Sequence, residues 1–110
     1  MQVTRYDAAK AYEAPEHYDM RCLRLQGKEA TNTDRIWIGL SHLLPGGRTS
    51  LKAAEVEKIY IVVAGEVTIE TPHENVTLGP LDSCRLAPGE ARALINRTNA
   101  PASILLAMPT

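Results

Sequence analysis

The chain has 110 residues, a length that suits one small domain with a single hydrophobic core. Lys and Arg total 12 and Asp and Glu total 13, so the net charge is −1, which argues against a histone-like or general nucleic-acid binder. No apolar run approaches the roughly 20 residues of a membrane span, and the first residues lack the apolar region of a signal peptide. We therefore expect a cytoplasmic protein with reduced thiols at Cys22 and Cys84 and without nucleic-acid or membrane partners.

The elements predicted along the chain are almost all strands. Residues 8–12 favour at most a short helical turn, which Pro15 ends. The Pro45-Gly46-Gly47 triplet predicts the end of a long strand, and Gly39 predicts a bend or bulge within that strand. The segments rich in strand-forming residues cover 20–25, 35–44, 58–63, 67–70, 76–78, 84–86, 92–96 and 103–108. Short strands at this close spacing indicate an all-β sandwich or barrel.

Two turn-bearing motifs are more specific than the strands. The first runs from Gly46 to Gly65, with Lys52, Ala54 and Lys58 between them. This spacing resembles the first motif of the cupin family, which reads Gly, five residues, His-x-His, three or four residues, Glu, six residues, Gly. The family's histidines and glutamate therefore correspond to Lys52, Ala54 and Lys58.

The second motif lies in the segment APGEARALIN. It resembles the cupin pattern Gly, five residues, Pro-x-Gly, two residues, His, three residues, Asn, with Gly89, Arg92 and Asn96 at the last three marks. Leu81 and Ala87 stand where the family has Gly and Pro, so neighbouring Gly and Pro residues must supply those turns.

The resemblance implies a fold. It predicts a single cupin domain over residues 1–110, a jelly-roll β-barrel, with its motif-bearing core at about 35–108. Residues 1–34 are then expected to pack on the barrel or on a partner subunit.

The resemblance also bears on metal binding. In metal-binding cupins the four matched positions bind one divalent ion, but here they carry Lys52, Ala54, Lys58 and Arg92. Ala has no donor atom, and Lys and Arg side chains are normally cationic, so this set would repel a metal. The three histidines do not point to another metal site, because His17 precedes the first predicted strand, His42 lies among aliphatic residues and His73 lies in a turn. We expect no metal and no cofactor.

Strand parity then gives the direction of the candidate side chains. The family's glutamate faces the barrel interior, so Lys58 and Tyr60 are expected to face inward, and by the same parity so are Arg92 and Asn96. The outward side chains of the same strand are aliphatic, namely Ile59, Ile61 and Val63. An exposed apolar face of this kind is normally buried against other protein, so we expect a homodimer.

These residues predict a cationic pocket for a small anion. Lys58 and Tyr60 are the catalytic candidates, as a base of lowered pKa and as a hydroxyl donor. The candidate ligand-binding residues are Arg92, Lys52, Asn96, Glu57 and His42. The predicted chemistry is a metal-independent isomerisation, dehydration or decarboxylation of a small oxo or hydroxy acid. A binding or sensing module without catalysis, or a structural accessory dimer, is the alternative.

Each candidate also has a purely structural interpretation. Lys58 and Glu57 can form a solvated pair, and Arg92 can close an internal salt bridge. Tyr60 can be a core residue, and His42 can be a hydrogen-bonded structural histidine. Cys84, although it neighbours an arginine in sequence, is best interpreted as a small buried residue.

Overall fold

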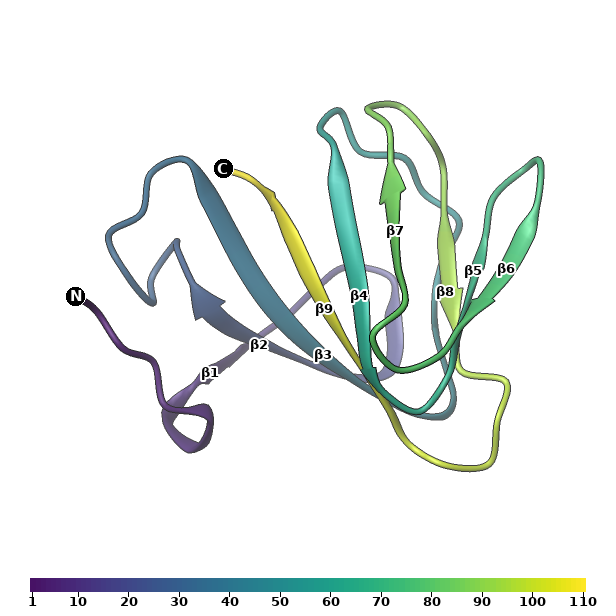
Figure 1. Cartoon of the computed structure of the whole chain (residues 1–110), viewed down its shortest axis with the longest axis horizontal. Coiled ribbons are helices and arrows are strands. Elements are labelled where there is room, and N and C mark those ends of the chain that lie inside the picture. Colours follow the sequence, from purple (N-terminus) through teal and green to yellow (C-terminus); the bar gives the residue numbers. More distant parts are fainter.

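The computed structural model describes all 110 residues as a β-barrel built from one antiparallel sheet. The strands, given by their bounds, are β1 (Lys10–Tyr12), β2 (His17–Gln26), β3 (Ile36–Thr49), β4 (Lys58–Ala64), β5 (Val67–Glu70), β6 (Asn75–Leu78), β7 (Ser83–Leu86), β8 (Ala93–Ile95) and β9 (Ala102–Pro109). They lie in the order β6-β5-β8-β3-β9-β4-β7, and the β1–β2 hairpin joins the other edge of β3 (Figure 1). The predicted all-β cupin-type barrel is therefore confirmed.

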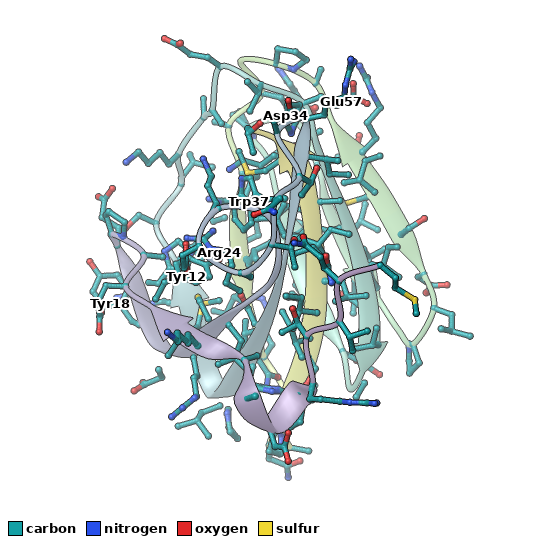
Figure 2. The ribbon with its side chains drawn as sticks, turned by 90° about the vertical axis from the view of Figure 1, so that its left-hand side faces the viewer. Tyr12, Tyr18, Arg24, Asp34, Trp37 and Glu57 are labelled. Atoms are coloured by element: carbon teal, nitrogen blue, oxygen red, sulfur yellow. The ribbon has the colours of Figure 1, made fainter.

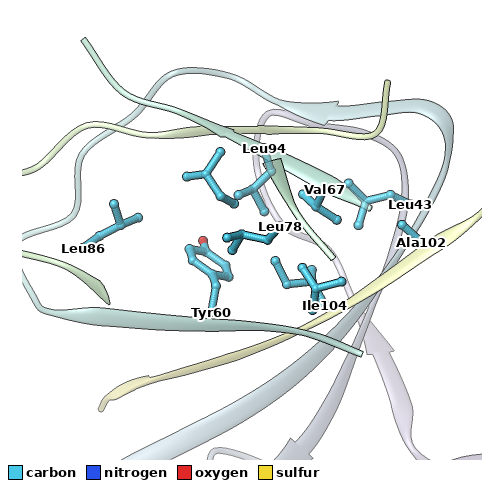
Figure 3. Close-up of a cluster of buried hydrophobic side chains, with 10 residues drawn as sticks. Leu43, Tyr60, Val67, Leu78, Leu86, Leu94, Ala102 and Ile104 are labelled. Carbon is cyan, nitrogen blue, oxygen red and sulfur yellow. The ribbon is translucent and has the colours of Figure 1, made fainter. Parts of the chain in front are cut away.

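The core fills the barrel interior. Its buried side chains come from all strands from β3 to β9 and are Leu43, Tyr60, Val62, Val67, Ile69, Leu78, Leu86, Leu94, Ala102 and Ile104 (Figure 3). The parity predicted for β4 holds, because Tyr60 and Val62 are buried while Ile59 and Val63 are exposed. Burial of these alternating apolar side chains is what drives the sheet to curl on itself.

The longest strand corrects one prediction. We expected Pro45-Gly46-Gly47 to end it near Leu44, but β3 continues to Thr49. Gly46 has a positive φ of 80°, a conformation that glycine adopts readily and that lets the strand bend here. The backbone N–H of Gly46 donates to the carbonyl of Asn96. The triplet therefore bends the strand without ending it, so β3 pairs with β9 through its first part and with β8 at Arg48.

The irregularity predicted at Gly39 is present, with its additional residue on the facing strand. Gly39 pairs with Arg24 and Ile38 pairs with Gln26, so the register shifts between Arg24 and Gln26 on β2. A Cβ atom at Gly39 would lie 2.9 Å from the Trp37 ring and 3.0 Å from the Tyr12 hydroxyl, so glycine also serves close packing.

The N-terminal segment packs on the barrel. In place of the helical turn expected over 8–12, a short 3₁₀ turn covers Tyr6–Ala8 and β1 follows it. The Tyr6 hydroxyl lies 2.8 Å from Nε2 of His42. Behind it, the Arg24 guanidinium lies over the Tyr12 ring at 3.8 Å and near the Trp37 ring at 4.5 Å (Figure 2). That single short turn is the only helix, and it has neither the length nor the apolarity of a membrane span.

The barrel wall is not fully closed. The two strands at the ends of the sheet order, β6 and β7, have no ladder between them. A cavity of about 190 Å³ lies along this seam, lined among others by Leu78, Cys84 and Glu90.

Candidate functional site

Arg92 is the most deeply placed charge of the barrel. Its residue is only 6% exposed, and two backbone hydrogen bonds with Lys52, of 2.9 and 3.1 Å, fix its position before β8. Its Nε donates to the Tyr60 hydroxyl at 2.9 Å and its Nη1 donates to Thr49 Oγ1 at 3.4 Å. The ion pairs of the structure all involve other residues, so the alternative interpretation of Arg92 as one half of an internal salt bridge does not hold.

This arrangement leaves part of the guanidinium free. No side-chain nitrogen or oxygen that is fully buried lacks a partner, and Arg92 Nη2 has no protein hydrogen bond. Nη2 therefore borders solvent. A nearly buried cation without a carboxylate is unusual, because removing a charge from water costs free energy that a counter-ion normally offsets.

Lys58 lies at the start of β4, on the same inward face as Tyr60. Burial, followed by repulsion from Arg92 and from Lys52, lowers the pKa of the Lys58 ammonium to about 8. No carboxylate pairs with Lys58, and Glu57 instead binds Arg85 at 2.8 Å on the surface, so the alternative of a Lys58–Glu57 pair does not hold.

Tyr60 has the mixed character of a core residue with a polar tip. Its ring is buried among Leu78 and Ile104, and its hydroxyl accepts the hydrogen bond from Arg92 (Figure 3). Burial raises the pKa of the Tyr60 phenol, although the Arg92 charge opposes this shift. The phenol therefore stays protonated at neutral pH.

Lys52 lies at the rim. Its side chain is mostly exposed, and its Nζ lies 3.5 Å from Oε2 of Glu16 in the β1–β2 connection. Directly after Glu16, β2 begins at His17, which pairs with Thr49 in the β2–β3 ladder. Burial, and then the charges of Arg92, Lys58 and Lys52, lower the pKa of the His17 imidazole, while its hydrogen bond to the Pro15 carbonyl works in the opposite direction.

His17 is the residue that sequence reasoning missed. Its position before a predicted strand gave no reason to place it beside residues 52, 58 and 92. The signal that can find it is the pairing of β2 with the far end of β3, and that pairing depends on β3 continuing beyond Gly47.

Two candidate ligand residues serve the fold. Asn96 is completely buried, and its amide nitrogen donates to the carbonyls of Leu43 and Ala100 while its oxygen accepts from Thr98. His42 lies outside the barrel, where Nδ1 is 2.7 Å from Ser103 Oγ. The structure therefore does not bring Asn96 or His42 to the cationic group as free ligand-binding side chains.

The open pocket expected around Lys58, Tyr60 and Arg92 is not among the main cavities, none of which these residues line. A cavity of about 190 Å³, the hairpin cavity, is lined by residues of the β1–β2 hairpin, including Tyr12, Glu13, His17 and Cys22. Burial raises the pKa of the Tyr12 phenol to about 12, so this cavity has a hydroxyl donor as well as an imidazole.

The residues present do not fit the metal ion that the resemblance implies. Ala54 has no donor, and Lys52, Lys58 and Arg92 bring positive charge to the same end of the barrel. Moreover, the structure contains no group of three or more His, Cys, Asp or Glu side chains that can hold a metal.

Comparison with known proteins adds a close sequence relative. No family model matches the chain. The chain is 41% identical over 106 residues to a Mycobacterium tuberculosis protein named "Beta-D-galactosidase Rv1717", covering 96% of this chain and 91% of the relative.

Solved structures agree on the fold at low sequence identity. The polyketide cyclase RemF from Streptomyces resistomycificus superposes with a TM-score of 0.89 at 18% identity, over 99% of this chain and 79% of that one. A sugar phosphate isomerase of the cupin superfamily from Silicibacter pomeroyi gives 0.81 at 21% identity, over 96% and 74%. These likenesses show that the chain has the cupin barrel fold, and the 41% identity over almost its whole length shows that it belongs to the same family as the Mycobacterium tuberculosis protein.

Proposed function

We propose that the cationic end of the barrel binds a small anionic ligand of the carboxylate type, without a metal ion. The observation that carries this proposal is Arg92, a guanidinium that is 6% exposed, has no carboxylate partner and keeps one nitrogen at the solvent border. Lys58 and Lys52 add positive charge, and only Lys52 is paired, with Glu16. A bound anion would supply the missing counter-charge.

The same group of residues supports proton-transfer chemistry. Lys58, with a pKa of about 8, exchanges its proton near neutral pH, and the Tyr60 phenol is held by Arg92. Such a constellation suits isomerisation, dehydration or decarboxylation of a small oxo or hydroxy acid, because the first two form a carbanion or enolate near a carboxylate and the third forms one where CO₂ departs. The free thiols of Cys22 and Cys84 accord with a cytoplasmic location, which we also propose.

The proposal is tested by calorimetry with a panel of small carboxylic acids, followed by the best binder on variants. Arg92→Ala is expected to weaken binding by roughly 1.5–3 kcal/mol, or about 10- to 150-fold, because a charged hydrogen bond is lost. Arg97→Ala is the matched control, since Arg97 is exposed and pairs with Glu70. Equal affinity in the Arg92 variant and the control would rule out this anion site.

The panel also separates the alternatives. Binding without any change to the acid would favour the sensing module. Absence of binding by every acid would favour the structural accessory dimer.

The sequence relative favours a second candidate, cleavage of β-D-galactosides. The relative is named for that activity and is 41% identical over nearly the whole chain. Most glycoside hydrolases use two carboxyl groups. In this chain Glu13 and Glu16 lie in the β1–β2 connection, with Glu13 lining the hairpin cavity and Glu16 beside Lys52.

Release of nitrophenol from nitrophenyl β-D-galactoside tests this candidate directly, with the α-anomer as the substrate control. Activity that survives a chelator and falls by at least tenfold in both Glu13→Gln and Glu16→Gln would support a metal-independent galactosidase. Glu55→Gln is the matched control, because Glu55 is exposed and lies outside this connection. Absence of nitrophenol release by purified protein would eliminate the candidate.

A further inference from the structure

His17 differs from the other candidate residues in its position. In the β2–β3 ladder it lies opposite Thr49, whose hydroxyl accepts a hydrogen bond from Arg92. It also lines the 190 Å³ hairpin cavity together with Tyr12 and Glu13. Residues directly opposite each other in an antiparallel pair share a face, so His17 lies on the face of Thr49, and the charges of Arg92, Lys58 and Lys52 act on its imidazole.

The hydrogen bonding of His17 determines which nitrogen is basic. Nδ1 lies 2.7 Å from the Pro15 carbonyl oxygen, which can only accept, so Nδ1 carries the hydrogen. In the neutral ring Nε2 is then an unprotonated base. The protein offers Nε2 no hydrogen-bond partner, and no fully buried polar atom is orphaned, so Nε2 is accessible.

The charges around His17 keep it neutral. Arg92, Lys58 and Lys52 lie on the barrel side, and all three lower its pKa, in addition to burial. On the cavity side are Tyr12, Glu13, Arg21 and Cys22, and Glu16 is the preceding residue. With its pKa below the ordinary 6.5, the ring is a free base at pH 7.

We infer that His17 is the general base of this site, accepting a proton at Nε2 from a small oxo or hydroxy acid whose carboxylate binds Arg92. The Nε2 lone pair forms the new N–H bond, and the electrons of the broken C–H or O–H bond remain on the substrate as an enolate or alkoxide. This inference rests on the proposed anion site and assigns the roles within it. Lys58, mostly protonated at pH 7, then serves as the acid that returns a proton, so two groups at one site have opposite roles.

The first test examines the ring itself and needs no substrate. Nitrogen NMR of the imidazoles across pH 4–9 should show His17 with hydrogen on Nδ1 and a pKa below the ordinary 6.5. Inorganic phosphate as the anion probe should raise the His17 pKa, because it offsets the neighbouring cations. Hydrogen on Nε2, or a His17 pKa at or above 6.5, would overturn the inference.

The second test measures proton abstraction with pyruvate as the oxo-acid probe. The protein in D₂O is expected to speed the exchange of the pyruvate methyl protons, and His17→Gln is expected to lose roughly 10²- to 10⁴-fold of this rate. His73→Gln is the control and should retain the full rate. Thermal shift with pyruvate should remain unchanged in His17→Gln, because Arg92 is intact.

The two claims fail in different ways. If neither pyruvate nor phosphate binds, the result counts against the anion site, and the NMR titration still decides the protonation state of His17. Pyruvate that binds but exchanges equally fast with His17→Gln contradicts the base, and leaves the anion site standing.

Discussion

The surroundings of the Lys58 ammonium disfavour its positive charge. The strand parity of β4 turns it inward, and burial, Arg92 and Lys52 all favour the neutral amine. Its folded pKa of about 8 lies below the ordinary 10.5 of an unfolded chain. At neutral pH the protonated side chain therefore lowers the free energy of unfolding, and this penalty is relieved as pH rises from about 8 to about 10.5.

We expect Lys58→Met to be more stable than the parent protein at pH 7, because the variant removes a desolvated charge while keeping a similar apolar stem. The difference should shrink progressively between pH 8 and 10.5. Urea unfolding at a series of pH values measures it. Lys28→Met, at an exposed position, is the control and should lack this pH dependence. A stability difference that stays constant across this range would contradict the lowered pKa.

At the residue scale, the sequence predicted which way side chains face better than it predicted the groups to which they hydrogen-bond. The alternation along β4 and β8 correctly placed Lys58, Tyr60, Arg92 and Asn96 inward, since a strand has only two faces. It gave no information on which groups they bind. Asn96 is saturated by backbone groups and Thr98, and this depends on a turn conformation that spacing does not encode.

At the scale of elements, β3 holds the molecule together. It pairs with β2 along one edge and with β9 and β8 along the other, so one bent strand connects both walls of the barrel. The prediction that Pro45-Gly46-Gly47 ends the strand failed, because the hydrogen bonds offered by a neighbouring segment decide whether such a sequence interrupts a strand. Here the backbone of Asn96 binds both Gly46 and Gly47, which keeps the strand going.

The Asn96 side chain adds to these backbone bonds, because its amide nitrogen donates to the Leu43 carbonyl just before the bend. Asn96→Ala should lower the free energy of unfolding by about 2–4 kcal/mol, since it removes the amide that binds the Leu43 and Ala100 carbonyls and leaves buried groups unpaired. Thermal or urea unfolding measures the loss. Asn99→Ala, three residues on at an exposed position, is the control. Equal stability of the two variants would show that the amide does not hold the bend.

At the scale of the whole molecule, the outer face of β4 is exposed. Ile59 and Val63 are 41% and 38% exposed, while the N-terminal segment reaches the barrel at His42 on β3. We propose that a second copy of the chain covers the β4 face, as a homodimer. Apolar side chains aligned on one strand suit such an interface, which typically buries about 1,600 Å² in total.

Light scattering should give a mass of twice the 12.0 kDa chain at micromolar concentration. Ile59→Glu should shift the population to monomer, because it places a charge in the middle of the proposed interface. Val76→Glu is a matched control, since Val76 is 42% exposed but lies on β6. A wild-type mass of one chain would refute the dimer.

The seam between β6 and β7 has a consequence for solubility. Unpaired strand edges are templates on which other chains can polymerise. Here both edges are only four residues long, and β7 carries Arg85 at its edge, so an incoming strand would gain few backbone bonds and would meet a charge. The barrel wall thus stays open along this seam without promoting fibril formation. Amide protection against hydrogen exchange should be lost first along these two strands.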